Sequence, residues 1–396
     1  MPRGKRILFL TCCPLIWGGS EELWSGAALR LKERGFEVLT GRSESWHGGR
    51  RHARWEALRS AGVGVNNFAV SGLGRAVPDA VKRFLPAFQR PVWRLRNLGL
   101  AAKIRLKSPD LVVISQGQAY DGCFPIGLPE ACQSAGVPYV LICQKAAEIH
   151  WPDDALRQLY RRCYREAAAA YFVSEHNQRT VEQQLAMALP RSQVVRNPFM
   201  VRVTEPLPWP TASEDVCRLA CVARIWPLEK AQDVILNVLA LDKWRSRPIE
   251  LSFFGEGPMA QGLREMAEWL GLSNVHFPGF TDPTEIWRKH HALLLPSRAE
   301  GLPLAQVEAM MCGRPVIVAD AGGTSEILRD GVHGFLANSP TVAAVDEAFE
   351  RAWHRRADWP AIGQAAAEHV RTLYPPDPCA TFADLLEQLH ASLVKT

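Results

Sequence analysis

The segment SRAEGLPLAQVEAMMCGRPVIVADAGGTSEILRDGVHGF, residues 297–335, decides the fold that we predict for this chain. It reads as a loop, a helix, a strand, a glycine turn and a second helix. Pro303 suits the first position of a helix and Gly313 suits a C-terminal stop, so the first helix is predicted over 303–312. The strand is predicted over 315–319. This alternation is typical of an α/β fold built on a parallel sheet.

The predicted helix at 303–312 carries an acid where an apolar residue is expected. Leu304, Val307 and Met311 stand at i, i+3 and i+7, and position i+4, which completes their stripe, is Glu308. A buried carboxylate is costly unless it is paired or hydrogen-bonded. Hydroxyl groups of a ligand would satisfy it. The structural alternative is that Glu308 pairs with a core arginine and that Glu300, in the preceding loop, is merely solvated.

The start of the same helix suits a phosphate. A helix N-terminus presents free N–H groups and the positive end of a dipole. Glu300 lies in the loop just before it, and Gly322 and Gly323 follow the strand, where they would let backbone approach a ligand closely. We therefore predict a ligand that combines phosphate and polyol groups.

These residues resemble the signature of the retaining nucleotide-sugar glycosyltransferases of family 4, which have the GT-B fold. The family pattern has two glutamates with seven residues between them, a CGxPVI strand, and then GGxxE and GxxGFL. All four parts occur here in that order, as Glu300 with Glu308, 312–317, 322–326 and 331–336. The resemblance implies an α/β chain of two Rossmann-like doubly wound domains facing across a cleft, with a C-terminal helix that crosses back to the first domain.

The composition fits such a chain. Its 396 residues suit two domains of roughly 200 residues each. Apolar residues make up 47% and charged residues 22%, which is ordinary for a soluble globular protein. The ten cysteines form no CxxC pair and no zinc-type spacing with histidine, so we interpret them as buried thiols in a reducing compartment. We therefore expect a cytoplasmic protein. Any contact with a membrane is expected to be peripheral and at its inner face.

Charge is divided unevenly along the chain. Residues 1–200 hold 28 Lys and Arg against 16 Asp and Glu, a net +12, whereas 201–396 hold 18 against 25, a net −7. Eight cations and no acid fall within 82–107, together with three aromatic residues, Phe84, Phe88 and Trp93. Such a segment either lies on an anionic membrane surface or docks an anionic acceptor, or it is a solvated helix. Nucleic acid is not expected, because no recognised module accompanies the charge. Pro86 and Pro91 are expected to prevent one continuous helix.

The first half alternates short apolar strands with helical stretches. Strands are predicted at 6–11, 36–40, 64–70, 110–115, 138–143 and 169–173. A helix at 20–33 is entered through Gly18 and Gly19, and because ligands of α/β folds bind beyond the carboxyl ends of strands, this turn would face a ligand. From its position alone, this turn is as well explained by a structural loop as by a ligand-binding loop. The family resemblance favours the second, because the family places a glycine-rich loop here against the donor diphosphate or the acceptor.

The second half repeats the pattern after a proline-rich linker at 196–214. Strands are predicted at 217–222, 249–254, 275–277, 292–295 and 315–319. The resemblance therefore implies an N-terminal Rossmann-like acceptor-binding domain at 1–198 and a nucleotide-sugar-binding domain at 199–375. It implies that residues 376–396 pack back on the first domain.

Two cations follow the first strand of the second half. Arg224 and Lys230 lie six residues apart, where they would neutralise a diphosphate. They resemble the family motif GRxxxxKG, with one extra residue between the cations and with Ala223 and Ala231 in place of its glycines. Gly255, in a GxG turn, and Phe280, in a segment similar to the one that packs on the nucleobase, complete the match.

The resemblance also implies the reaction, a retaining transfer of a hexose from a nucleotide sugar with no covalent intermediate, no metal and no cofactor. The donor would be a UDP-sugar or a GDP-sugar, and the acceptor a glycan or a lipid-linked glycan of polysaccharide biosynthesis. Arg224 and Lys230 would stabilise the leaving diphosphate, Glu300 would bind sugar hydroxyls and Glu308 the ribose. The implied donor-binding set is Gly18, Gly19, Gly255, Phe280, Gly301, Leu302, Pro303, Leu304 and Glu308.

The chain departs from the family at one place. Many members carry a histidine at the end of a first-domain strand near the sugar, where this chain has Gln144. Gln144 can hydrogen-bond a sugar hydroxyl but cannot act as a base, and His176 either points into the acceptor or sugar pocket or is a plain loop histidine. Other functions stay open, namely a nucleotide-sugar epimerase of the same fold and a non-catalytic nucleotide-sugar binder. A dehydrogenase is disfavoured, because no GxGxxG with a distal acid opens either domain.

Overall fold

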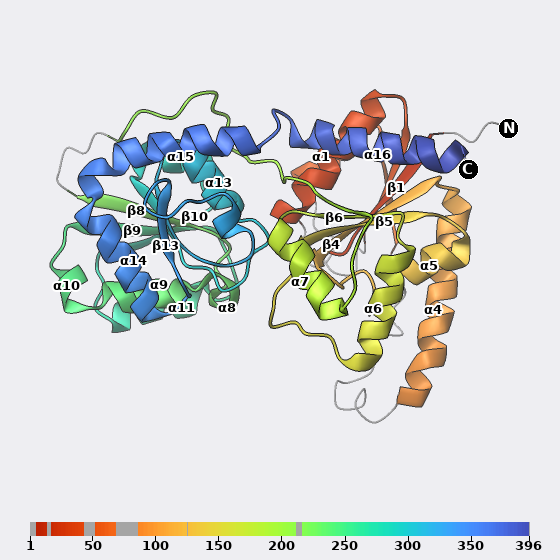
Figure 1. The fold of residues 1–396 in the computed structure, drawn as a ribbon, viewed down its shortest axis with the longest axis horizontal. Helices are drawn as coiled ribbons and strands as arrows, with labels where there is room; N and C mark the ends of the chain where they lie inside the picture. The colour runs from red at the N-terminus through yellow and green to blue at the C-terminus, as the bar shows by residue number, and fades with distance from the viewer. Residues whose placement is uncertain are drawn as a thin grey trace. The chain divides into compact units, whose positions relative to one another are not determined.

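A computed structural model of the chain describes residues 5–13, 17–42, 52–68, 86–124, 126–210 and 216–395. The chain divides into two compact units, whose folds are shown in Figure 1. Unit 1 comprises Met1–Val173, Asn177–Asn197 and Asp377–Thr396. Unit 2 comprises Ser174–His176 and Pro198–Pro376. Each unit is built around one parallel sheet, as predicted.

Unit 1 has a seven-stranded sheet in the order β3-β2-β1-β4-β5-β6-β7, with every described pair parallel. The strands are β1 Arg6–Thr11, β2 Glu37–Arg42, β3 Gly64–Asn67, β4 Leu111–Gln118, β5 Tyr139–Lys145, β6 Ala169–Phe172 and β7 Ser192–Val194. The sequence predicted the first six of them within a few residues. It missed β7, which is too short and too polar to show an apolar run.

Helices cover both faces of this sheet, because side chains along a strand point alternately to either side. Ile7 and Phe9 belong to one buried cluster, with residues of α1 Glu22–Glu33 and α2 Ala53–Ser60. Leu8 and Leu10 belong to the other. That second cluster takes in residues of α4 Pro86–Lys107, α5 Leu128–Ala135, α6 Asp154–Glu166 and α7 Glu175–Leu185. Unit 1 is therefore a doubly wound, Rossmann-like unit.

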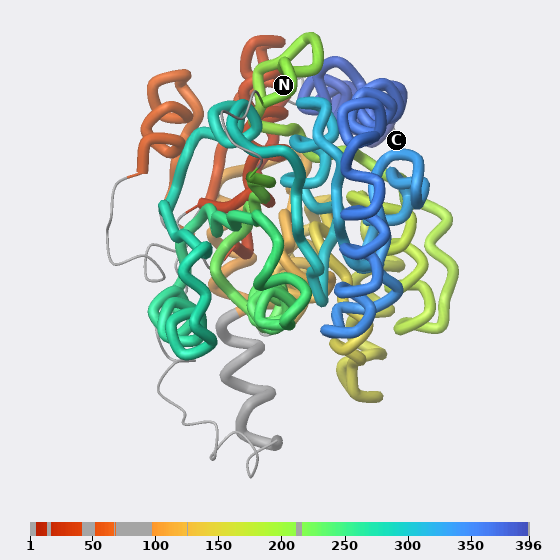
Figure 2. Tube along the Cα trace, turned by 90° about the vertical axis from the view of Figure 1, so that its left-hand side faces the viewer, coloured from red at the N-terminus to blue at the C-terminus, as the bar shows by residue number. Residues whose placement is uncertain are grey.

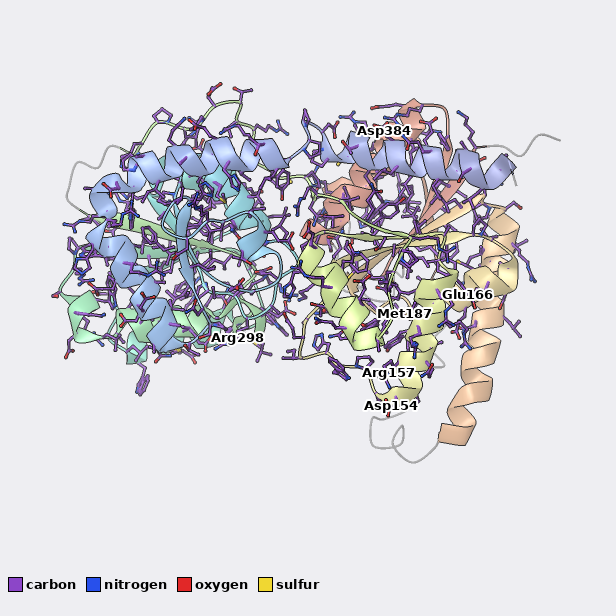
Figure 3. The ribbon with its side chains drawn as sticks, in the orientation of Figure 1. Asp154, Arg157, Glu166, Met187, Arg298 and Asp384 are labelled. Atoms are coloured by element: carbon purple, nitrogen blue, oxygen red, sulfur yellow. The ribbon has the colours of Figure 1, made fainter. Side chains whose placement is uncertain are left out.

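The last helix, α16 Pro378–Lys395, belongs to unit 1 and packs against α1 (Figure 1). Phe382 and Leu386 are fully buried in the same cluster as Ile7 and Phe9. Asp384, labelled in Figure 3, forms an ion pair with Arg34, in which Oδ1 of Asp384 lies 2.7 Å from Nη1 of Arg34. The prediction that the final helix returns to the first domain is confirmed.

Unit 2 has a six-stranded parallel sheet in the order β10-β9-β8-β11-β12-β13. Its strands are β8 Cys217–Val222, β9 Ile249–Phe254, β10 Val275–Gly279, β11 Ala292–Leu295, β12 Val316–Ala319 and β13 Gly334–Ala337. Its helices are α8 Pro227–Lys230, α9 Gln232–Leu239, α10 Asp242–Arg245, α11 Ala260–Trp269, α12 Pro283–Lys289, α13 Leu304–Met311, α14 Val342–His354 and α15 Trp359–Leu373. Figure 2 shows α14 running alongside β12 and β13. The prediction of two Rossmann-like sheets is confirmed.

The stretch 297–335 differs from its prediction in two details. The first helix is α13, Leu304–Met311, with Pro303 as its N-cap residue rather than its first helical residue. The predicted second helix is only a 3-10 turn, η3 Thr324–Glu326, and the GxxGFL motif forms strand β13. Gly331 and Gly334 have φ of 71° and 159°. These positive values favour glycine and end the helical conformation, so the chain enters strand β13 instead of continuing a helix.

The prediction that prolines break the segment 82–107 is wrong, because α4 is continuous over its 22 residues. Pro86 occupies the first helical position, where a missing N–H costs nothing, and Pro91 removes a single bond near the same end. Lys82 and Arg83 lie outside the described residues, as do the side chains of 86–96. None of the helices in the described part of the chain has the length and hydropathy of a membrane span.

The proline-rich segment after Asn197 is fastened to unit 2 by one buried arginine. Arg314 is 1% exposed, and burial lowers the pKa of its guanidinium to about 10. Its Nη1 and Nη2 donate to the carbonyl oxygens of Leu207 and Pro208 at 3.2 and 2.6 Å, and its Nε donates to Trp287 O at 2.9 Å. The guanidinium also lies 5.3 Å from the ring of Trp209. Residues 206–209 are therefore part of the fold of unit 2.

Candidate functional site

The candidate site lies where the connections of the second sheet diverge. β8 and β11 are neighbours in the sheet, and β9 and β12 lie on their outer sides. Ligands of doubly wound folds bind beyond the carboxyl ends of strands at such a switch point. The loop after β8 carries Arg224 and Lys230, and the loop after β11 carries Glu300.

Lys230 and Glu300 form a close ion pair at this edge. The Nζ atom of Lys230 lies 2.6 Å from Oε1 of Glu300, although the two residues are 70 positions apart. The hydroxyl of Ser297 donates to the same oxygen at 2.7 Å. The side chains of Lys230 and Glu300 are only 17% and 8% exposed. The ion pair is therefore weakly screened by water, and its charges act strongly on anything bound beside it.

The loop that carries Glu300 is anchored both to α8, which ends at Lys230, and to the following helix α9. Arg298, labelled in Figure 3, donates from Nη1 and Nη2 to both oxygens of Asp233 at 2.7 and 2.8 Å. Its backbone N–H donates to the carbonyl of Glu229 at 2.7 Å. A bidentate pair fixes orientation as well as distance. The relative position of Lys230 and Glu300 is thus set by contacts outside the pair.

Arg224 lies in the same loop as Lys230 but has different neighbours. Its guanidinium lies 4.9 Å from the ring of Trp226 and forms a 3.4 Å ion pair with Glu229. Gly255 has a φ of 124°, and a Cβ there would lie 2.2 Å from the carbonyl oxygen of Ala223. Gly255 therefore lets the loop after β9 pack on the backbone next to Arg224.

Ala231, directly after Lys230, has a left-handed backbone with φ of 51°. Such a conformation disfavours any residue with a Cβ and suits glycine. Glycine is the residue that the family motif has at this position. This chain thus has a left-handed turn after Lys230 although it places alanine there.

The start of α13 meets the loop of Glu300. No described side chain caps this helix, and Leu304 is its first residue. Leu302 and Pro303 are buried beside it. A Cβ on Gly322 would lie 2.2 Å from the carbonyl oxygen of Glu300, and Gly323 N–H donates to Gly301 O at 2.7 Å. The two glycines thus admit the backbone of 300–301, and a close approach of this turn to a ligand stays a prediction.

Glu308 is buried, as predicted, and is 4% exposed. Its Oε1 accepts a hydrogen bond from the backbone N–H of Met200 at 2.8 Å. The helix is buried on every side from Ala305 to Met311, so Glu308 does not stand on one apolar stripe. A backbone N–H thus supplies one of the hydrogen bonds of this carboxylate.

The family of unit 2 follows from comparison with known proteins. The model of the family "Glycosyl transferases group 1" matches residues 217–355. That range contains Lys230, Glu300 and Glu308 together with the strands that position them. Residues 217–355 form a group 1 glycosyltransferase domain. The resemblance drawn from the motifs is confirmed.

Two relatives are similar to part of this chain. The D-inositol 3-phosphate glycosyltransferase of Streptomyces griseus is 37% identical over 166 residues, which is 38% of this chain and 34% of the relative. The GDP-mannose-dependent alpha-(1-6)-phosphatidylinositol monomannoside mannosyltransferase of Mycolicibacterium smegmatis is 31% identical over 143 residues, which is 33% of this chain and 37% of the relative. The chain thus matches about a third of the length of these curated relatives.

Likeness to solved structures extends over the whole chain. Anabaena Alr3699/HepE, solved in complex with UDP, aligns with a TM-score of 0.72 and 18% identity, over 98% of this chain and 100% of that one. The same protein has also been solved with UDP-glucose. At this identity the match establishes the fold alone, and it confirms the predicted GT-B architecture around the glycosyltransferase domain.

The other predicted donor residues are more scattered. Phe280 follows β10 and is 81% exposed. Gly18 and Gly19, in unit 1, precede α1, and neither has a positive φ, so backbone handedness does not require glycine there. His176 lies in the first turn of α7 rather than in a loop, and its backbone N–H donates to Oε1 of Glu326 at 2.7 Å. Gln144 lies inside β5.

Several residues at these edges were not predicted. Ser297 and Arg298 were quoted as part of the deciding stretch, but only the sheet order shows that they hold Glu300 and its loop. Asn197 lies at the start of the segment predicted as a linker, and its side chain bonds Gln144. All three are polar residues within three positions of the carboxyl end of a strand.

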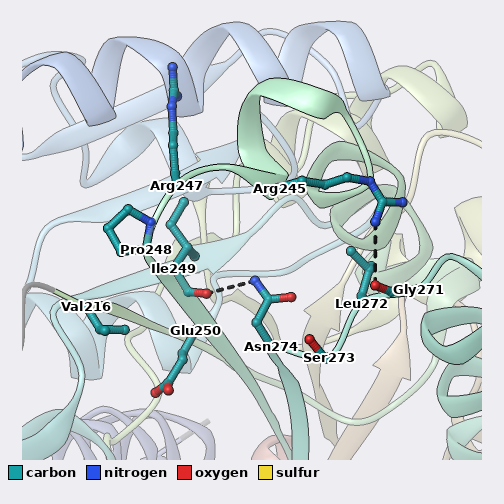
Figure 4. Close-up of a pocket in the computed structure, with 10 residues that line it drawn as sticks. All are labelled: Val216, Arg245, Arg247, Pro248, Ile249, Glu250, Gly271, Leu272, Ser273 and Asn274. Carbon is teal, nitrogen blue, oxygen red and sulfur yellow. Dashed lines mark hydrogen bonds between the residues drawn. The ribbon is translucent and has the colours of Figure 1, made fainter.

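A separate cavity of about 300 Å³ lies at the opposite edge of the second sheet (Figure 4). It is lined by residues at the amino ends of β9 and β10, among them Ile249 and Asn274. Arg245 and Arg247 beside it are bound to Gly271 O and to Glu350. The cavity therefore lies away from the candidate site. Within the described ranges, no three His, Cys, Asp or Glu side chains are grouped as metal ligands, and metal independence stays a prediction.

Glu21 of unit 1 has a buried side chain near the carboxyl ends of the strands. Glu21, just before α1, is 2% exposed. Burial raises the pKa of its carboxyl from the ordinary 4.5 to about 7, against a smaller lowering by its hydrogen bond to Thr11. Between these two pH values the unfolded chain releases the proton while the folded chain keeps it. The contribution of Glu21 to folding stability therefore falls as the pH rises through this window.

We expect Glu21→Gln to remove the loss of folding stability that Glu21 causes as the pH rises. At pH 8 the variant should be more stable than the original chain by about 3 kcal/mol, the value of a shift of this size. At pH 4 the two should be alike, because Glu21 is then protonated in both states. Urea unfolding followed by tryptophan fluorescence at pH 4, 6 and 8 measures the difference. A difference that stays constant with pH would contradict the assignment.

Proposed function

We propose that the chain is a retaining glycosyltransferase that moves a hexose from a UDP-sugar or GDP-sugar to a glycan or lipid-linked acceptor without a metal ion. The observation that carries this proposal is the buried Lys230–Glu300 pair at the switch point of the group 1 glycosyltransferase domain. Its cation suits a diphosphate and its anion suits sugar hydroxyls. Relatives of this domain are named for transfer to inositol phosphate and to a phosphatidylinositol mannoside.

The proposed chemistry requires stabilisation of a leaving group. When the bond between the sugar and the diphosphate breaks, negative charge grows on the phosphate oxygens. Lys230, Arg224 and the N-terminus of α13 near Leu304 would stabilise that charge. Because they are fixed in place by the surrounding loops, little reorganisation is needed during the reaction. Glu300 would then exchange Lys230 for sugar hydroxyls and hold the sugar for attack from the face that the diphosphate leaves.

The remaining partners follow from the same proposal. Unit 1, the more basic part of the chain, would bind the acceptor, and Gly18 and Gly19 would lie near it. An anionic lipid surface is a further proposed partner, through α4 and the cations within 82–107. The protein would then act at the inner face of the membrane. Donor binding would lie in unit 2, with Gly255, Phe280, Gly301, Leu302, Pro303, Leu304 and Glu308.

The experiment combines a panel of donors with a panel of acceptors. The chain is incubated with UDP-glucose, UDP-galactose or GDP-mannose, with and without myo-inositol phosphate or oligosaccharides, and release of nucleoside diphosphate is measured with and without EDTA. We expect release that depends on an acceptor, that EDTA does not change, and that gives products with the anomeric configuration of the donor by NMR. Isomerised donor without any acceptor would indicate an epimerase. Binding without release in any combination would indicate a non-catalytic binder.

Replacement of Glu308 should weaken donor binding. In Glu308→Ala the ribose would lose its carboxylate acceptor, and we expect the Kd for UDP to rise roughly tenfold or more, the loss of one or two charge-assisted hydrogen bonds. Isothermal titration with UDP and GDP measures the effect. Glu308→Gln is the matched control, because its amide oxygen can still accept from Met200 N–H while the charge is lost. If Glu308→Ala binds both nucleotides like the original chain, Glu308 has no part in donor binding.

A further inference from the structure

The helix that ends at Lys230 is too short to hold its own position. α8 is a single turn of four residues, and none of the four is buried. Leu228, its one large aliphatic side chain, is 64% exposed and gives no anchor in the core. A single helical turn is not stable by itself. The place of Lys230 therefore depends on polar contacts between α8 and its neighbours.

Polar contacts of this kind come from the loop after β11. The backbone N–H groups of Arg298 and Ala299 donate to the carbonyl oxygen of Glu229 at 2.7 and 3.2 Å. The Nη1 atom of Arg298 donates to the carbonyl oxygen of Pro227 at 2.6 Å. Arg298 thus binds α8 with both its backbone and its side chain, and Glu300 follows two residues later in the same loop.

The side chain of Arg298 is itself held by a well-packed helix. Five apolar residues of α9 are buried, so the position of α9 is fixed by the core of unit 2. Asp233, in its first turn, accepts from both terminal nitrogens of Arg298 at 2.7 and 2.8 Å. A bidentate pair fixes the orientation of a guanidinium as well as its distance. Arg298 therefore connects the exposed turn α8 to the core through α9.

The contacts of Arg298 surround the Lys230–Glu300 pair without belonging to it. The 2.6 Å contact between Nζ and Oε1 of that pair requires α8 and the loop after β11 to keep their relative position. A misplacement of about 1 Å can slow an enzyme reaction by roughly 100-fold. We infer that Arg298 is a positioning residue, which places Lys230 beside Glu300 and thereby sets the rate of transfer. This inference rests on the proposed function, in which Lys230 acts on the leaving diphosphate.

A similar pair elsewhere in unit 2 supplies a matched control. The Nη1 atom of Arg351 donates to both carboxylate oxygens of Asp330 at 3.0 and 2.8 Å, and its Nη2 atom donates to the carbonyl oxygen of Leu336 at 2.8 Å. The side chain of Arg351 is 36% exposed and that of Arg298 is 34% exposed. Arg351 joins α14 to β13 and to the turn before it. Its removal therefore deletes the same kind of interaction without a change to α8.

The first measurement is the steady-state release of nucleoside diphosphate, with a donor and an acceptor that the original chain uses. We expect Arg298→Ala to lower kcat by roughly 10- to 100-fold, as a misplaced catalytic group does. KM should change by less than about threefold, because the lost alignment matters most in the transition state. Asp233→Ala should lower kcat in the same direction, and Arg351→Ala should leave it unchanged. Arg298→Lys keeps the charge but not the fork of donors, so kcat should stay well below the original value.

Double variants show whether Arg298 acts through Lys230. In Lys230→Met the cation that Arg298 positions is already absent, so adding Arg298→Ala should lower kcat further by less than about twofold. Losses that multiply would mean that the two residues act independently and would overturn the inference. Full activity of Arg298→Lys, or an equal loss in Arg351→Ala, would overturn it as well. A single cooperative unfolding transition of unit 2 shows that each variant is folded.

A second readout does not depend on activity. Urea unfolding of Lys230→Met, Glu300→Gln and the double variant gives the coupling between these two residues. We expect that coupling to fall by at least about half when the same cycle is measured with Arg298→Ala in every chain, because the pair is then less well aligned. A coupling that is unchanged overturns the inference. If the original chain releases nucleoside diphosphate from no donor, the proposed function fails, and the unfolding cycle still decides on Arg298.

Discussion

Lys230→Met is expected to lower kcat by roughly 100- to 1,000-fold, the loss found when a fixed donor to a developing anion is removed. Lys230 bonds Glu300 in a largely water-excluded position, and the proposed reaction builds charge on the diphosphate beside it. Because that charge is greater in the transition state than in the bound donor, KM should rise much less than kcat falls. Steady-state release of nucleoside diphosphate measures both constants.

Two further variants make this prediction specific. Lys243 also forms ion pairs in unit 2, with Asp346 and Glu350, but lies on another part of the unit, so Lys243→Met should leave kcat unchanged. Removal of Lys230 also leaves Glu300 with Ser297 as its one remaining described partner and could disturb the loop. The double variant Lys230→Met with Glu300→Gln removes that uncompensated charge. A double variant that recovers the original kcat would show that Lys230 acts only by balancing Glu300.

Arg314→Ala is expected to destabilise unit 2 by roughly 3 to 5 kcal/mol, because it opens a cavity and leaves buried carbonyl groups without donors. The guanidinium of Arg314 donates to Trp287, Leu207 and Pro208 and is 1% exposed. Since it holds residues 206–209 on the unit, its loss should also release that segment to proteolysis. Urea unfolding of the full chain and limited proteolysis measure the two effects.

Arg202→Ala is the matched control for this change. Arg202 lies in the same segment but is exposed, so its removal should alter the free energy of unfolding by less than about 0.5 kcal/mol. Arg314→Lys is a second comparison, because a lysine keeps the charge but cannot reach three carbonyl groups in the geometry of a guanidinium. If Arg314→Lys is as stable as the original chain, charge alone accounts for the effect and the hydrogen bonds do not.

Much of the fold could be predicted because the central strands are rich in apolar residues. β1, β8, β9 and β11 have the predicted bounds, since each strand ends where a loop begins. β7 lacks that signal, being three residues long with two polar residues, and the residues of β13 were assigned to the predicted second helix. The helix α4 was missed for the opposite reason, because Pro91 was given more weight than its position close to the helix start justifies.

The candidate site was predicted residue by residue, but its contacts were not. Lys230 and Glu300 are 70 positions apart in the chain, and only the neighbouring position of β8 and β11 brings them together. Gly322 and Gly323 were predicted to let backbone approach a ligand, but their close contact with the backbone of 300–301 was not foreseen. In both cases the sequence shows that a residue is unusual, whereas the partner depends on the order of strands in the sheet.

The position of α16 has a consequence for synthesis on the ribosome. Phe382 and Leu386 complete a buried cluster with Ile7 and Phe9, so one face of the N-terminal sheet stays only partly covered until α16 has been translated. Unit 2 lies almost entirely between those segments and needs nothing that is made later than Pro376. Nascent chains usually acquire structure from the N-terminus onward. Here we expect the reverse order, with the unit that is begun first being the last to close.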